Sequence, residues 1–146
     1  MGIIKSAGLA IVYQKKLLIL HPTNHRWNDG YSIPKGKLEK GEEPIDAAIR
    51  ETYEEAGIQV PRELVGDEGV VIVYRKGKES KGKSYKRVHW FRVDIEDLSQ
   101  LGIDSEILDQ ENLSLREVDW GGFIGGSELR EKIFWRFLPI VSALEI

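Results

Sequence analysis

The chain has 146 residues, of which 41% are hydrophobic and 31% are charged, and its net charge at pH 7 is −3. A chain of this length builds one domain with its own core, and this charge balance excludes a strongly basic nucleic-acid binder. The absence of cysteine excludes disulfides and thiolate metal sites and fits a cytoplasmic location, and no apolar run approaches the roughly 18 residues that cross a membrane.

The N-terminal third of the chain alternates apolar segments with turn signals. Its first residues lack the charged start, apolar stretch and cleavage site of a signal peptide. Residues 6–13 predict a buried strand, and residues 17–20 predict its hairpin partner. Residues 21–36 are rich in Pro, Asn and Gly and therefore predict a loop, with a brief strand at 31–33 near its end.

A helix is predicted next, over residues 44–56. Pro44 suits the first helical position, where its missing N–H costs nothing, and Gly57 can adopt the left-handed conformation that ends a helix. Small and apolar residues recur at helical spacing along one side: Ile45, Ala48, Ile49, Thr52 and Ala56. We therefore expect this side to be buried.

Three carboxylates share a second arc of this helix, beside the apolar one. They belong to Glu51, Glu54 and Glu55. Like charges one turn apart cost about 0.2–0.5 kcal/mol in an isolated helix. A divalent cation such as Mg²⁺ or Mn²⁺ prefers oxygen ligands and would turn this repulsion into a binding site. The alternative is a solvated acidic helix, which has no need of a particular arginine or glycine nearby.

The second half of the chain predicts three further strands. Residues 58–60 form a short one, limited by Pro61, and residues 70–74 and 85–93 form two clear ones. A glycine- and lysine-rich hairpin loop joins the last two. Residues 94–119 are acidic and predict an irregular segment.

A second helix is predicted over residues 128–144, with Ser127 as its N-cap. Its apolar face consists of Leu129, Ile133, Phe134, Phe137, Ile140 and Val141. Two helices with five or six strands predict a mixed α/β fold, and we expect residues 1–146 to form a single domain.

The spacing of residues around the first helix matches a known family pattern. The matching residues are Gly36, Glu42, Arg50, Glu51, Glu54, Glu55, Gly57 and Ile58. Their order and spacing resemble the Nudix box: Gly, five residues, Glu, seven residues, Arg-Glu, an aliphatic, any residue, Glu-Glu, any residue, Gly, aliphatic. Thr52 departs from the pattern at the aliphatic position, although its methyl group can still pack inward. The resemblance implies the Nudix fold, a mixed sheet between helices, over nearly the whole chain.

The resemblance also implies a reaction. Nudix hydrolases use Mg²⁺ or Mn²⁺ to cleave a diphosphate linked to another group, usually a nucleoside, by attack of water on phosphorus. By position, Glu54 and Glu55 match metal ligands of the family, and Glu51 matches a residue that binds metal or deprotonates the water. The backbone carbonyl around Gly36 is a further ligand in many members, and glycine permits this close approach.

Three other charged positions complete the predicted catalytic site. Arg50 lies one turn before Glu54 and can hold a carboxylate with two parallel hydrogen bonds, so we interpret it as an orienting residue. Glu42 is expected to tie the preceding loop to the helix. Many relatives recruit one more acid from a distant loop, and the candidates here are Glu111, Glu117 and Asp119, of which Glu111 is chosen as a metal ligand. The alternative for each of the three is a solvated acidic loop.

Substrate contacts are predicted from four basic or aromatic sites. The segment 33–36 resembles one found in dinucleoside-polyphosphate, diphosphoinositol-polyphosphate and decapping members, and its Lys35 can reach a phosphate as a point charge. Seven basic residues lie between positions 75 and 87 against one acid: Arg75, Lys76, Lys78, Lys81, Lys83, Lys86 and Arg87. They can attract a phosphorylated ligand, with Lys76 and Lys86 as contacts, or they form a solubilising loop. Trp27 and Tyr31 can stack on a base or pack into the core.

Three functions remain open at this level. The first is hydrolysis of a nucleoside or dinucleoside polyphosphate, and the second is the same reaction on a diphosphoinositol polyphosphate or a capped RNA. The third is a Nudix-fold module that senses a nucleotide without hydrolysing it. Such modules typically lose box carboxylates, whereas all of them are present here. The expected partner is a phosphorylated small molecule. A nucleic acid is expected to bind only through a capped or 5′-phosphorylated RNA end. The protein is expected to be a monomer or a homodimer.

Overall fold

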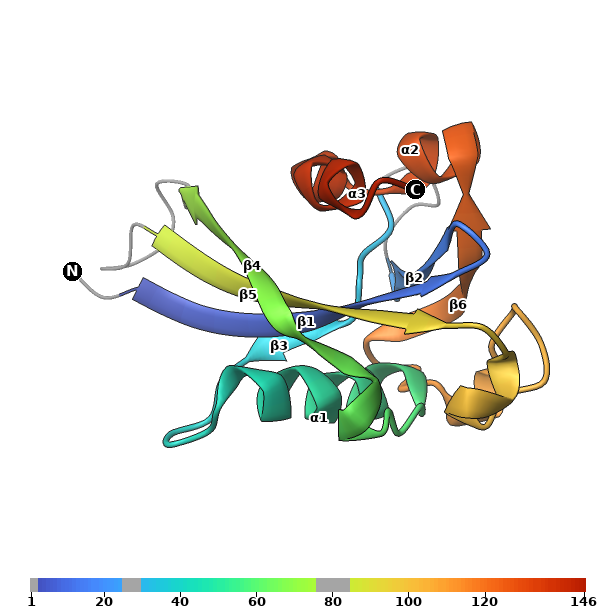
Figure 1. Ribbon diagram of the computed structural model, residues 1–146, viewed down its shortest axis with the longest axis horizontal. Helices are drawn as coiled ribbons and strands as arrows, with labels where there is room; N and C mark the ends of the chain where they lie inside the picture. Colours follow the sequence, from blue (N-terminus) through green and yellow to red (C-terminus); the bar gives the residue numbers. More distant parts are fainter. Residues whose placement is uncertain (1–2, 25–29, 76–84) are drawn as a thin grey trace.

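Strands from the whole length of the chain form one mixed sheet, with helices on both of its faces (Figure 1). The computed structural model describes residues 3–24, 30–75 and 85–146. The strands are β1 (Ile3–Tyr13), β2 (Lys16–Pro22), β3 (Lys35–Lys37), β4 (Val65–Arg75), β5 (Tyr85–Ile95) and β6 (Val118–Gly125). The α-helices are α1 (Pro44–Ala56), α2 (Gly126–Lys132) and α3 (Leu138–Leu144), and short 3₁₀ helices are η1 (Arg62–Leu64), η2 (Leu98–Leu101), η3 (Gln110–Asn112) and η4 (Trp135–Phe137). The predicted α/β class is confirmed.

The sheet has the order β4-β5-β1-β2-β6, and β3 pairs with β1 outside this path. Strands β1 and β5 are parallel, and the other pairs are antiparallel. Strand β1 changes partner along its length, since Gly8 pairs with Lys35 of β3 while Val12 pairs with Leu17 of β2. A Cβ at Gly8 would collide with the carbonyl of Pro34. The missing side chain therefore lets β3 lie against β1 at the start of the Nudix-like segment.

Alternate residues of the central strand face two separate cores. Leu9 and Ile11 of β1 belong to the cluster that packs against α1, whereas Ala10 and Val12 belong to the cluster that packs against α2 and α3. Because the side chains of a strand alternate between faces, one strand with no exposed residue in its centre requires a layer on each side. Figure 1 shows α1 on one face and α2 with α3 on the other. None of the helices among the described residues has the length and apolar character needed to cross a membrane.

Helix α1 has the bounds that the sequence predicts. Pro44 occupies its first turn, and Gly57 ends it with φ of 71° and a backbone N–H that donates to Tyr53 O. Thr52 is fully buried, and its hydroxyl donates to Ala48 O at 2.8 Å. This bond satisfies the one polar group of the side chain, which explains how threonine is accommodated at a position that the pattern reserves for an aliphatic residue.

The predicted last helix is wrong, because two helices and a 3₁₀ turn occupy that segment. Helix α2 begins one residue before Ser127, and its N-cap is Gly125 without a side-chain hydrogen bond. Helix α3 begins at Leu138, with proline in its first turn. Pro139 cannot lie inside a continuous helix, because it lacks an N–H and its ring would clash with the carbonyl four residues earlier. The break is further fixed by the Phe134 N–H, which donates to Tyr31 O at 2.9 Å.

Three other sequence predictions need correction. Residues 58–60 form no strand, although Ile58 and Val60 are buried. Residues 31–33 make only isolated bridges, such as that between Ser32 and Leu20, rather than a strand. The segment 94–119, predicted to be irregular, contains η2 and η3 and leads directly into β6, which the sequence analysis missed. These elements depend on partners distant in sequence, so local patterns carry little signal for them.

Gly57 provides a test of how α1 is joined to the rest of the fold. A Cβ at Gly57 would collide with the backbone carbonyl of Asn112, whereas a Cβ at Gly41, also at positive φ, would meet nothing within 4 Å. We expect Gly57→Ala to lower the free energy of unfolding by roughly 1–3 kcal/mol. Gly41→Ala should lower it by about 1 kcal/mol, the cost of the backbone conformation alone. Urea unfolding of both variants measures the difference, and equal losses would show that the contact with Asn112 contributes nothing.

Candidate active site

Arg50 joins the loop before α1 to the helix itself. Its Nε and Nη2 donate to the two carboxylate oxygens of Glu42 at 2.9 and 3.0 Å, a parallel pair of charged hydrogen bonds. Nη2 also donates to Lys37 O at 3.0 Å. Glu42 accepts a further bond from the Glu39 N–H at 3.0 Å. These bonds lower the pKa of Glu42, and they connect loop and helix in the way that the sequence analysis expected of Glu42.

The third nitrogen of the same guanidinium holds two carboxylates of the helix. Arg50 Nη1 donates to Glu51 Oε1 at 2.9 Å and to Glu54 Oε2 at 3.1 Å. One positive charge therefore lies between acids that would otherwise repel each other. Arg50 thus contacts the helix carboxylates, and the orienting role predicted for it stays a prediction.

Glu51 lies directly against the backbone of β3. A Cβ at Gly36 would collide with the Glu51 carboxylate, so only glycine at this position leaves room for it. Burial raises the pKa of Glu51 above its usual range, and its bond to Arg50 opposes that shift. The role predicted for Gly36, a backbone carbonyl that binds the metal, stays a prediction.

Glu55 is the most strongly perturbed acid in the site. Its Oε1 accepts a hydrogen bond from the Lys35 N–H at 2.9 Å. Burial nevertheless raises the pKa of Glu55 to about 8, and the negative charges of Glu51 and Glu117 act in the same direction. Without a nearby cation, the carboxyl group is therefore mostly protonated at neutral pH.

A distant acidic segment reaches the C-terminal end of α1. The Ser114 N–H donates to Glu55 O at 3.2 Å, and the Glu117 N–H donates to Ser114 O at 2.8 Å. Of the three acids considered for this segment, Glu117 is the one whose charge acts on Glu51 and Glu55. Asp119 Oδ1 lies 2.6 Å from His21 Nδ1 instead.

Glu111, the acid chosen from the sequence, lies in η3. Its N–H donates to Asp109 Oδ1 at 3.1 Å, and its own charge is not among those that shift the box carboxylates. Its role as a metal ligand stays a prediction. The sequence offered three acids in one irregular segment and no periodicity to choose among them, so the position of Glu117 could be found only from the fold.

The predicted metal ligands supply oxygen donors but no preassembled metal centre. Within the part of the chain that the structure describes, no three His, Cys, Asp or Glu side chains are grouped so as to hold an ion. Glu51 and Glu54 are instead held by Arg50. The donors still fit a hard divalent cation, because a cation beside Glu55 would offset the burial of that carboxylate and Gly36 leaves its backbone accessible to the site.

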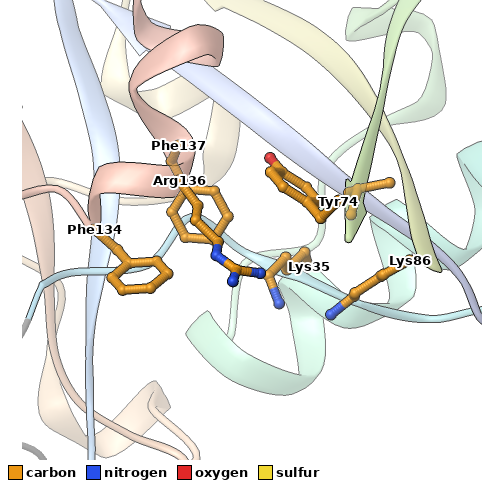
Figure 2. Close-up of a pocket in the computed structure, with 7 residues that line it drawn as sticks. Lys35, Tyr74, Lys86, Phe134, Arg136 and Phe137 are labelled. Carbon is orange, nitrogen blue, oxygen red and sulfur yellow. The ribbon is translucent and has the colours of Figure 1, made fainter. Parts of the chain in front are cut away.

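The predicted substrate residues separate into three groups. Lys35 and Lys86 line one pocket of about 230 Å³ (Figure 2). Tyr31 is 5% exposed and contacts His21 edge-on at 5.1 Å, which is the packing alternative rather than a free stacking surface. Trp27 and Lys76 lie outside the described residues.

The same pocket contains side chains that the sequence analysis did not select. They are Tyr74, Val88, Phe134, Arg136 and Phe137. The one available signal was an arginine inside the apolar run 133–138, which a continuous helix would have carried on its solvent face. The break between α2 and α3 instead brings Arg136 beside Lys35.

Comparisons with known proteins agree with this geometry. A NUDIX domain family model matches residues 4–131. The chain is 33% identical over 98 residues to an ADP-ribose pyrophosphatase of Haemophilus influenzae, covering 67% of this chain and 42% of that protein. It is 30% identical over 82 residues to diphosphoinositol polyphosphate phosphohydrolase 3-alpha of Mus musculus, covering 56% of this chain and 46% of that protein. The chain thus spans less than half the length of these curated relatives.

Solved structures share the whole fold. The crystal structure of the C. elegans Ap4A hydrolase superposes with a TM-score of 0.61 at 24% sequence identity, covering 99% of this chain and 95% of that one. The arrangement of strands and helices is therefore held in common well beyond the segment that carries the sequence pattern.

The pKa of Glu55 predicts how the metal-free protein responds to pH. Below about pH 4 the carboxyl group is protonated in both the folded and the unfolded chain, so it has no effect on stability. Between about pH 4 and 8 the unfolded chain ionises Glu55 and the folded protein does not, so the free energy of unfolding falls as pH rises. We expect the fall due to Glu55 to amount to a few kcal/mol in all, with a steepest slope of about 1.4 kcal/mol for each step of one in pH.

Glu55→Gln should remove that component. In EDTA, urea unfolding between pH 5 and 9 should give a smaller decline for the variant than for the wild type, and a more stable variant at the alkaline end. Glu63→Gln, at an exposed position in η1, is the matched control and should follow the wild type. Parallel curves for all three proteins would contradict the assignment of a perturbed carboxyl group to Glu55.

Proposed function

This chain belongs to the NUDIX domain family, and from that premise we propose that it is a metal-dependent hydrolase that cleaves a diphosphate linkage in a nucleoside or dinucleoside polyphosphate. One observation carries the proposal: the helix carboxylates Glu51 and Glu54 meet at Arg50, beside Glu55, whose pKa burial raises to about 8 despite the charge of Lys35. A module that only binds nucleotides does not need these box carboxylates, and such modules typically lose them.

A divalent cation, Mg²⁺ or Mn²⁺, would supply charge neutralisation for the phosphates and for the attacking water. Glu54, Glu55 and the backbone carbonyl of Gly36 are the groups proposed to hold it, and Glu51 is either a further ligand or the group that takes up the proton of the attacking water. Glu111 remains the proposed additional ligand. Glu117 is the alternative, because its negative charge raises the pKa of both Glu51 and Glu55.

The proton of the attacking water is proposed to pass to Glu51. Burial raises the pKa of this carboxylate, so it accepts a proton more readily than an exposed one does. Arg50 fixes Oε1 by its hydrogen bond, which leaves Oε2 as the accepting atom. The water oxygen attacks one phosphorus, and the bridging oxygen leaves with the other phosphate, so no covalent enzyme intermediate is required. The alternative role for Glu51 is that of a metal ligand.

The proposed setting of the reaction follows from the sequence. A phosphorylated small molecule is the proposed substrate, and an RNA enters only through a capped or 5′-phosphorylated end. A cytoplasmic location is supported by the absence of cysteine from all 146 residues.

The metal assignment is tested by Glu55→Gln. Loss of a direct ligand should reduce turnover by more than the roughly 10–100-fold typical of residues that only support a ligand. Phosphate release from nucleotides, dinucleoside polyphosphates, ADP-ribose and diphosphoinositols, with Mg²⁺ and with Mn²⁺, measures this. Added Mg²⁺ should raise the melting temperature of the wild type more than that of Glu55→Gln. Equal metal stabilisation of both proteins would overturn the ligand assignment, and Glu63→Gln should behave as wild type in both measurements.

The orienting role is tested by Arg50→Lys. A lysine cannot reproduce the parallel bonds to Glu42 together with those to Glu51 and Glu54, because an ammonium is a single point charge. We expect kcat to fall by about 10–100-fold. The matched control is Arg62→Lys, since Arg62 forms an exposed pair with Asp46 and its replacement should leave kcat unchanged. A fully active Arg50→Lys enzyme would show that its geometry is not needed.

A further inference from the structure

A positively charged pocket lies on the face of the sheet that α2 and α3 cover, and Lys35 links it to the box. Three cations from three parts of the chain line it: Lys35 of β3, Lys86 of β5 and Arg136 of η4. Figure 2 shows their charged ends pointing toward one another, with the Phe137 ring behind Arg136 and the Phe134 ring to its left. The sheet and the break between α2 and α3 therefore gather charges that are far apart in sequence.

The seven residues that line the pocket include no acid. In the described parts of the chain, neither Lys35 nor Arg136 forms an ion pair. Their contacts are with aromatic rings: Lys35 Nζ lies 5.9 Å from the centre of Phe137, and the Arg136 guanidinium lies 5.2 Å from the centre of Trp135. All three cations are partly buried. Partly buried like charges repel, and an anion placed among them relieves the repulsion more effectively than it would on an open surface.

Lys35 connects this pocket to the box. Its backbone N–H donates to Glu55 Oε1 at 2.9 Å, whereas its side chain lines the pocket. The charge of Lys35 also acts on Glu55, where it lowers the pKa against the larger effect of burial. A group bound in the pocket is thus about one lysine side chain away from the carboxylates proposed to hold the metal.

We propose that this pocket binds a phosphate group of the substrate that is not cleaved, and that Arg136 determines specificity there. The inference rests on the proposed function and narrows it to substrates with phosphates beyond the scissile diphosphate. The cavity of about 230 Å³ is smaller than the roughly 300–1,000 Å³ of sites for drug-sized ligands, which favours one or two phosphates over a whole nucleoside. Arg136 offers a planar fork that matches phosphate oxygens, and the two lysines offer point charges.

The pocket is tested first by binding, without metal and without turnover. Calorimetric titration with inorganic tripolyphosphate in EDTA should show about ten-fold weaker binding to Arg136→Gln than to the wild type. Arg136→Lys should fall between them, because it keeps the charge and loses the fork. Arg130→Gln removes the same charge from an exposed site on α2 and should bind as wild type. Equal affinity of Arg136→Gln and wild type, with equal melting temperatures, would overturn the proposal.

The second measurement identifies the source of the phosphate. Inositol hexakisphosphate and adenosine tetraphosphate are titrated into the same proteins. The ligand that loses more affinity for Arg136→Gln, relative to the wild type, represents the class of substrate whose phosphate the pocket binds. With turnover, kcat/KM of Arg136→Gln should fall more for a dinucleoside tetraphosphate or a diphosphoinositol than for ADP-ribose, whose two phosphates are both at the cleaved linkage. An equal fall for all three substrates would contradict a site for an additional phosphate.

The two proposals fail separately. If the wild type hydrolyses none of the substrates, the proposed function is wrong, and the tripolyphosphate titration still decides whether the pocket binds phosphate. If the wild type is an active hydrolase and the titration shows no dependence on Arg136, the function stands and the inference about the pocket is wrong.

Discussion

The hydrogen bonds of Arg50 are the interaction on which the rest of the site depends. One guanidinium binds Glu42 in the loop, Lys37 O at the end of β3, and Glu51 and Glu54 on the helix. A planar group with fixed donors can hold four partners only if the loop, strand and helix keep one relative position. The side chain therefore acts as a structural centre as well as a charge, and its bonds lower the pKa of Glu42 while keeping the helix acids together.

Lys35 lies between the acidic side chains of the box and a pocket lined by basic side chains. On one side, burial raises the pKa of Glu55, so a positive charge placed beside its carboxyl group would favour the ionised form. On the other side, Lys35, Lys86 and Arg136 line a pocket without an acid. The proposed phosphorylated substrate with a divalent cation would complement both regions at once, with the cation near the carboxylates and a remaining phosphate near the basic side chains. The charge of Lys35 only partly offsets the burial of Glu55, so a bound cation would supply what the folded chain lacks there.

The glycines of this region position backbone rather than provide flexibility. Gly8 allows β3 to lie against β1, and Gly36 allows the Glu51 carboxylate to lie against β3. Gly57 combines a left-handed conformation with close contact to Asn112, which brings the segment carrying Glu117 to the end of α1. In each case a side chain would occupy the space of a neighbouring segment, so the acids of the site would move apart.

Local sequence determined the helix and the placement on it of the residues proposed to be catalytic. Pro44, Gly57 and the apolar spacing between them fix the bounds of α1, because caps and periodicity act over a few residues. The same spacing places Arg50, Glu51 and Glu54 within one turn, and α1 has its predicted bounds while the ligand roles remain predictions. The hairpin of β1 and β2 was also predicted from apolar runs between turn signals, as were parts of the two long strands that follow: residues 70–74 of β4 and residues 85–93 of β5.

The tertiary structure alone decided the pocket, the acid that reaches the box, and the C-terminal helices. Lys35, Lys86 and Arg136 become neighbours only because β1 pairs with both β3 and β5 and because the chain breaks after α2. Periodicity predicted one helix there, since the apolar positions of α2, η4 and α3 happen to continue at helical spacing, and Pro139 was the signal against it. Glu117 rather than Glu111 acts on Glu55 because β6 pairs with β2 and carries its approach segment past α1. Such long-range pairings are set by the packing of the whole core, which no short segment of the sequence encodes.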